Sequence, residues 1–200
     1  VYEQVITING LSKGFAMTGW RLGYMCAPKQ IAKAVTKLQG QFTSGTTSIT
    51  QRACVTALEN TAAKDKVVAE MGAAYQRRRD LMFDLLSAIP GVEVIKPDAA
   101  FYLFPDVSSF FGKKTTKGEV INDAGDLALY LLNVAHVSTV TGAAFGAPNH
   151  IRLSFATSDE RIQEGLNRPR FEIFAGRLFC AFRASLESFS VPVRVTFTIV

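Results

Sequence analysis

The segment from Asn9 to Gly23 combines a lysine and an arginine that could capture a carbonyl compound and hold its anionic group. Lys13 stands among small and apolar residues, and Arg21 follows eight positions later. A desolvated lysine has a lowered pKa, and its neutral amine attacks carbonyl carbons and forms Schiff bases. An arginine presents a rigid fork of N–H donors that fits a phosphate or a carboxylate. The pair therefore predicts Schiff-base chemistry beside a bound phosphate.

Three motifs in a fixed order extend this pattern along the chain. Gly10–Gly23 resembles the lysine signature of class I/II aminotransferases, the aspartate aminotransferase-like enzymes of fold type I that use pyridoxal 5'-phosphate (PLP). Pro97–Pro105 resembles a strand of that family's small domain. Val140–Gly146, followed by Ile151–Ala156, resembles its substrate-carboxylate arginine segment. The resemblance covers residues 1–168 and concerns the C-terminal half of the family.

The resemblance implies a role for each candidate site residue. Lys13 would form the internal aldimine with the cofactor and later move the proton between the substrate Cα and the cofactor. Arg21 would bind the cofactor phosphate, and Ser12 is a further candidate because the family's serine three positions before the lysine is here Gly10. Arg152 would bind the substrate α-carboxylate. The substrates implied are an amino acid and a 2-oxo acid.

Charge does not indicate a nucleic-acid partner. The net charge is +5, but residues 168–200 hold five arginines and two glutamates, which leaves the rest of the chain nearly balanced. We interpret Arg77–Arg79 as a solvated helix face. No run of about twenty apolar residues predicts a membrane helix.

Cysteine and histidine spacing does not indicate a metal site. Cys26, Cys54 and Cys180 lack the close spacing of metal ligands, and they are expected to be free thiols of a cytoplasmic protein. His136 and His150 are isolated from other ligand types.

An α/β set of elements is expected to position the candidate residues, with strands on both sides of the lysine segment. The last helix is expected to open with a capping box at Thr157 and Glu160. Hydrophobic periodicity and turn residues predict strands at 5–8, 22–26, 92–95, 101–104, 137–140 and 151–155, and helices at 28–40, 49–58, 62–89 and 123–135.

The fold expected is the C-terminal part of a fold type I PLP-dependent transferase: the end of the large-domain sheet, the long linking helix and the small α+β domain. We predict a large-domain remnant at 1–60, the linking helix and small domain at 61–168, and an atypical tail at 169–200. The tail is crowded with apolar residues and has no clean helical period. A frameshift or annotation error would explain it as non-native, and a lineage-specific extension is the alternative.

The predicted function is transamination, with aspartate as the best-supported amino acid because residues 15–21 resemble that subgroup. In the family, the acidic partner of the pyridine nitrogen and the stacking ring precede the lysine, whereas this chain starts twelve residues before Lys13. We therefore expect the chain alone to be inactive or nearly so. The family resemblance also implies that the intact parent is a homodimer. The alternatives are a fold type I lyase, decarboxylase or acyl-condensing enzyme, and a non-catalytic module or pseudogene product.

Overall fold

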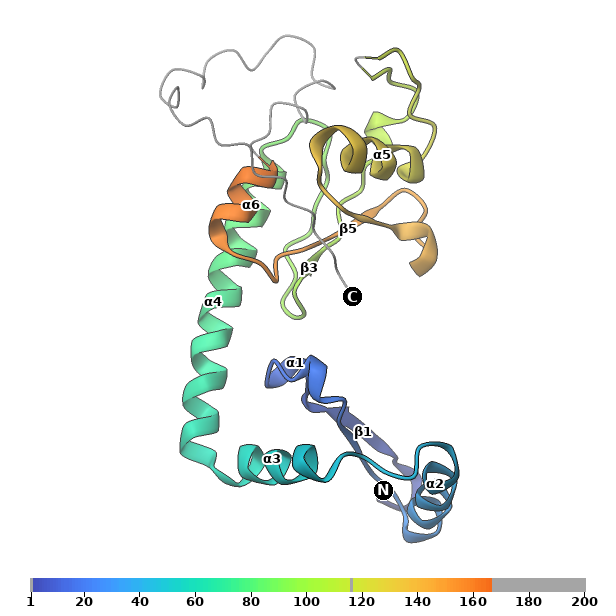
Figure 1. The fold of residues 1–200 in the computed structure, drawn as a ribbon. Helices are drawn as coiled ribbons and strands as arrows, with labels where there is room; N and C mark the ends of the chain where they lie inside the picture. The colour runs from blue at the N-terminus through green and yellow to red at the C-terminus, as the bar shows by residue number, and fades with distance from the viewer. Residues whose placement is uncertain (1, 116, 167–200) are drawn as a thin grey trace. The chain divides into compact units, whose positions relative to one another are not determined.

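The computed structural model describes residues 2–115 and 117–166 (Figure 1). These residues form two compact units, and the division between Ala73 and Ala74 falls within helix α4 (Thr61–Ser87). The predicted tail at 169–200 lies outside the described residues, and the domain boundaries at 60/61 and 168/169 stay predictions. No helix within the described part of the chain is long and apolar enough to cross a bilayer.

The first unit is organised around an antiparallel pair of strands, β1 (Thr7–Gly10) and β2 (Gly23–Cys26). Their register runs from Thr7 opposite Cys26 to Gly10 opposite Gly23. The twelve residues between them hold α1 (Leu11–Gly14) and the 3-10 turn η2 (Thr18–Trp20). The predicted strands on both sides of the lysine segment are thus present, although β1 begins two residues later than expected.

Helices make up the rest of the first unit, which also contains the 3-10 turn η1 (Tyr2–Gln4), α2 (Lys29–Phe42) and α3 (Ser48–Glu59). The helix predicted at 28–40 was too short, because α2 continues past Gly40 to Phe42. Thr43 caps α2 through a hydrogen bond from its N–H to the Gln39 carbonyl. A glycine inside a helix lowers the stability of the helix by only about 1 kcal/mol relative to alanine, so Gly40 does not have to end α2. Among residues 3–73 only Leu11 and Thr50 are buried.

The second unit contains a small antiparallel sheet in the order β3 (Tyr102–Leu103), β5 (Ile151–Ser154), β4 (Val140–Thr141). The strand predicted at 92–95 was wrong, since in the described residues this segment makes only an isolated bridge between Glu93 and Asp106. The remaining elements of this unit are the 3-10 turns η3 (Ser108–Phe110) and η5 (Gly142–Phe145), α5 (Ala124–Tyr130), the π-helical turn η4 (Leu131–Ala135), and α6 (Asp159–Leu166).

The core of this unit lies against one face of the sheet. Alternation along β5 buries Ile151 and Leu153, with Leu103 of β3 beside them, and leaves Arg152 and Ser154 half-buried on the other face. The core is completed by Phe155, which directly follows β5, and by residues of α4, α5, η4 and α6, chief among them Met82, Leu86, Leu127, Leu131 and Ile162. A packed sheet face therefore fixes the direction in which Arg152 points.

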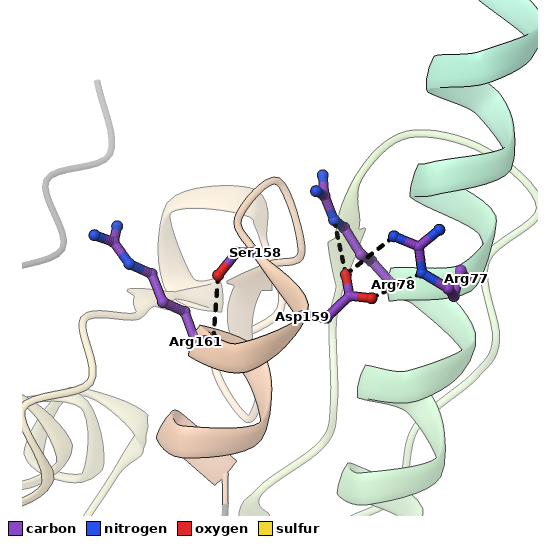
Figure 2. A network of polar contacts seen from close by, with 5 residues as sticks. All are labelled: Arg77, Arg78, Ser158, Asp159 and Arg161. Atoms are coloured by element: carbon purple, nitrogen blue, oxygen red, sulfur yellow. Dashed lines mark hydrogen bonds and ion pairs between the residues drawn. The ribbon is translucent and has the colours of Figure 1, made fainter.

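Two arginines of α4 bind the first residue of α6 (Figure 2). Arg77 Nε lies 2.7 Å and Arg78 Nε 3.1 Å from the two carboxylate oxygens of Asp159. The hydrogen bond from Arg77 is the main reason that the pKa of Asp159 lies below its ordinary value. The Arg77–Arg79 face, interpreted from sequence as merely solvated, therefore also joins two helices.

The start of α6 differs by one residue from the predicted capping box. The amide of Arg161 donates to Ser158 Oγ at 3.4 Å, so Ser158 and not Thr157 provides the capping oxygen (Figure 2). Asp159 therefore becomes the first helical residue, where its negative charge faces the positive end of the helix dipole as well as the two arginines.

Candidate active site

Lys13 lies on a single helical turn whose first residue is anchored in the protein. Leu11 is 1% exposed, and its amide donates to the Leu22 carbonyl at 3.4 Å. The turn ends where the amide of Ala16, at a φ of 53°, donates to the Lys13 carbonyl at 3.3 Å. The Lys13 backbone is thus held at both ends of the turn, between the paired strands β1 and β2.

An open hollow of about 380 Å³ adjoins this turn, and its lining includes both Ser12 and Lys13. Residues 9–15 form most of it, together with Tyr24 of β2 and Leu58 of α3. The Lys13 side chain is exposed, so the desolvation that we expected from its apolar neighbours was wrong for the described residues. An exposed amine next to a hollow is accessible to an aldehyde, but this surrounding does not exclude water from it.

Arg21 directly follows η2, an element that contacts α1. Its backbone is left-handed, with φ 50° and ψ 56°, a conformation that is rare for residues other than glycine and is found disproportionately at ligand sites. Its Nη1 donates to the Thr18 carbonyl at 2.8 Å, which leaves further N–H donors of the exposed guanidinium facing solvent. Arg21 does not belong to the lining of the hollow, although the resemblance places both Lys13 and Arg21 at one cofactor.

Arg152 lies in β5, opposite Val140 of β4, on the face of the sheet away from the core. The carbon at the centre of its guanidinium is 4.3 Å from the centre of the Tyr102 ring and 4.7 Å from that of Phe145. Within residues 2–115 and 117–166, the side chain of Arg152 forms no hydrogen bond and no ion pair. A half-buried cation with unused donors is suited to binding an anion.

The family model for aminotransferase class I and II matches residues 1–168, which include both the lysine turn and Arg152. The chain belongs to this family. It is 43% identical to an aspartate aminotransferase of Pinus pinaster over 84% of the chain, and 44% identical to a probable aspartate/prephenate aminotransferase of Aquifex aeolicus over 81%. The crystal structure of an aspartate aminotransferase from Rhizobium meliloti superposes on 86% of the chain with a TM-score of 0.81 and 40% identity.

The matched region accounts for less than half of these aminotransferases. The chain spans 34% of the length of the Pinus protein, 39% of the Aquifex protein and 43% of the Rhizobium chain. The predicted fold, part of a fold type I transferase with mixed helices and strands, is confirmed by these comparisons. Lys13 and Ser12 lie together in the first unit, and Arg152 belongs to the second.

Sequence reasoning on the aminotransferase motifs missed the surroundings of Arg152. Tyr102 and Phe145 entered it only as members of the motifs at 97–105 and 140–146. Because side chains two apart in a strand share a face, the pairing of β3 with β5 would have placed Tyr102 beside Arg152. No comparable signal identifies Phe145, whose position depends on the turn after β4.

Proposed function

We propose that this chain supplies the cofactor lysine and the substrate arginine of a PLP-dependent aminotransferase, which exchanges an amino group between an amino acid and a 2-oxo acid. The observation that carries the proposal is Lys13, an exposed lysine at an open hollow inside the segment matched to the family. Relatives named aspartate aminotransferase, at 40% and 43% identity, favour aspartate as the amino acid.

The hollow fits PLP in size, and the side chains of the lysine segment, including Arg21 outside the lining, fit it in chemistry. A volume of about 380 Å³ is within the range of small-molecule sites. Lys13 offers a primary amine for the aldehyde, while the remaining N–H donors of Arg21 and the hydroxyl of Ser12 suit a phosphate. When bound, the cofactor supplies an electron sink that stabilises negative charge at the substrate Cα.

The three charged side chains have separate tasks in this proposal. Arg152 binds the substrate α-carboxylate through two parallel N–H···O bonds, which fixes the direction of the Cα–H bond. Lys13 Nζ would accept the Cα proton as a general base and then, as a general acid, would donate it to the bound cofactor and not back to Cα, as transamination requires. Arg21 stays on the phosphate throughout and keeps the reacting atoms in place.

The roles proposed for Lys13 and Arg21 are tested by titrating the purified chain with PLP and recording the visible absorbance of the amine-bound cofactor. Lys13→Ala is expected to abolish the saturable absorbance, and Arg21→Ala to weaken binding about tenfold, the value of one lost charge-assisted contact. Lys37→Ala, which removes an exposed lysine of α2, is the matched control. Equal titrations of all four proteins would overturn the roles given to Lys13 and Arg21.

We further propose that the chain alone converts L-aspartate no faster than free PLP does. Lys13 is exposed, and the chain spans only 34% to 43% of its relatives' lengths. The assay follows oxaloacetate formation with 2-oxoglutarate as acceptor. Turnover that Lys13→Ala removes would refute the inactivity but support transamination. Product or carbon dioxide formed without an acceptor would instead favour a lyase or decarboxylase.

The intact parent is proposed to be a homodimer, because family sites borrow residues across the dimer interface, and to reside in the cytoplasm. The location is supported by Cys26 and Cys54, both free thiols in the structure. Sedimentation of the chain at increasing concentration tests whether it associates by itself.

A further inference from the structure

We propose that Tyr102 and Phe145 are positioning residues, which hold the guanidinium of Arg152 between two rings and leave its N–H donors for a carboxylate. We call this set the Arg152 sandwich: Tyr102, Arg152 and Phe145. The inference rests on the proposed function in one respect, that Arg152 is the residue that binds the substrate α-carboxylate. It adds a structural reason why the Arg152 side chain is already in position and why its N–H donors are available to a carboxylate.

Both rings are within contact distance of the cation. The guanidinium carbon lies 4.3 Å from the Tyr102 ring centre and 4.7 Å from the Phe145 ring centre, inside the 6 Å or so over which a cation is attracted to a ring face. Tyr102 reaches this position because it is paired with Ser154, two residues from Arg152 on the same face of the sheet. The sheet register therefore fixes one side of the sandwich.

A tight turn after β4 fixes the other side. Gly142 donates its amide to the His150 carbonyl at 2.7 Å, and its own carbonyl accepts the Ala147 amide at 3.0 Å. These bonds close residues 142–150 into a compact loop that carries Phe145. The Phe104 ring then meets the Phe145 ring edge-on, with the ring centres 6.1 Å apart. Phe145 therefore has an aromatic neighbour besides Arg152, although it is 52% exposed.

An aromatic ring beside a guanidinium has a different effect from a carboxylate beside it. A carboxylate would satisfy the guanidinium by occupying its N–H donors, and a substrate would have to displace it. A ring face stabilises the positive charge without using a donor, and within residues 2–115 and 117–166 no group forms a hydrogen bond or an ion pair with the Arg152 guanidinium. Holding this flexible side chain in advance also removes part of the entropy that binding would otherwise cost.

These arguments predict a measurable loss when a ring is removed. One exposed cation–π contact or one immobilised side chain changes an affinity about fivefold. Tyr102→Leu and Phe145→Leu are therefore each expected to weaken carboxylate binding about fivefold, and Tyr102→Phe, which keeps the ring, is expected to bind like wild type. Phe83→Leu is the matched control, since Phe83 is also half-buried under a cation, Lys96, but does not touch Arg152.

The test uses the full 200-residue chain labelled with nitrogen-15, in which the Arg152 Nε–H signal is assigned by its loss in Arg152→Gln. The two rings are expected to shift this signal upfield from the other arginines. Titration with L-aspartate should move it saturably, whereas isoasparagine, in which the α-carboxylate is an amide, should not. The ratio of L-aspartate affinities between wild type and each ring variant is the quantity measured.

The outcomes separate the two claims. No response of the Arg152 signal to L-aspartate in wild type would overturn its substrate role, and with it this inference. A normal response in wild type, combined with unchanged affinity in both leucine variants, would overturn the sandwich alone. An equal loss in Phe83→Leu would also overturn it, since the effect would then be a general change of packing. Because Phe145 is 52% exposed, its replacement leaves the buried core intact.

Discussion

Substituting Gly142 by alanine tests how tightly the loop that carries Phe145 is built. A Cβ atom at this position would lie 2.1 Å from the Ala147 carbonyl oxygen and 2.8 Å from that of His150. Neither oxygen belongs to a flexible side chain, so the backbone must move by roughly 1 Å to reach an ordinary contact. Such overpacking costs about 1 to 3 kcal/mol, and the two hydrogen bonds that close the loop add about 1 kcal/mol each when lost. We expect a loss of about 4 kcal/mol in unfolding free energy.

The assay is urea unfolding followed by circular dichroism, with Gly146→Ala as the control. Gly146 has a φ of 77° and no atom within 4 Å of an added Cβ, so its substitution carries only the strain of the left-handed backbone, about 1 kcal/mol. If Gly142→Ala costs no more than Gly146→Ala, the close approach of Gly142 to the loop backbone is not what fixes this turn. The Arg152 signal should also lose its upfield shift in Gly142→Ala.

Three further predictions concern the helices of the chain. Gly72, exposed inside α4 with no atom near an added Cβ, should gain about 0.5 to 1 kcal/mol of stability as Gly72→Ala in the same unfolding assay; a loss would show a contact that the structure does not contain. Asp123 accepts the amides of Gly125 at 2.7 Å and Asp126 at 2.9 Å, so Asp123→Ala should cost about 1 kcal/mol and Asp123→Asn much less. Because the arginines at α4 lower the pKa of folded Asp159, this carboxylate stabilises the fold above its ordinary pKa and loses that contribution as the pH falls through the lowered value. The stability difference between wild type and Asp159→Asn should therefore shrink on acidification, and a difference that grows would contradict the ion pairs.

The sequence predicted well those features that depend on neighbouring residues. The strands around Lys13, the long helix at 62–89 and the strand that carries Arg152 are all present, because periodicity reports directly which faces are apolar. The family resemblance indicated which of these residues are candidates for the site. In these respects local pattern and three-dimensional structure agree.

Features that depend on contacts distant in sequence were predicted poorly. Val92 to Ile95 has the composition of a strand, yet Ile95 is 87% exposed and the segment finds only one bridging partner in the described residues. Ser158 and not Thr157 caps α6, and the next residue, Asp159, forms ion pairs with Arg77 and Arg78, which are about eighty residues away in the sequence. The Arg152 sandwich requires both the β3–β5 register and the turn at Gly142, and neither is a property of the residues flanking Arg152.

The exposure of Lys13 shows a different limit of sequence reasoning. Its neighbours are small and apolar, which suggested a desolvated amine, but desolvation depends on what covers the residue and not on what precedes or follows it. In the described residues the side chain is exposed beside an open hollow. The chemistry proposed for Lys13 therefore rests on the family match of its segment and on the adjoining hollow more than on its immediate apolar setting.

Reductive trapping of PLP on the purified chain tests the central claim most directly. Borohydride fixes a cofactor bound to an amine, and mass spectrometry of the digested chain then locates the pyridoxyl group. We predict that it lies on Lys13 in preference to exposed lysines such as Lys37, and that the preference is lost with pyridoxal, which lacks the phosphate, or in Arg21→Ala. Label spread equally over the exposed lysines with PLP would contradict the assignment of Lys13 and Arg21 to one cofactor site.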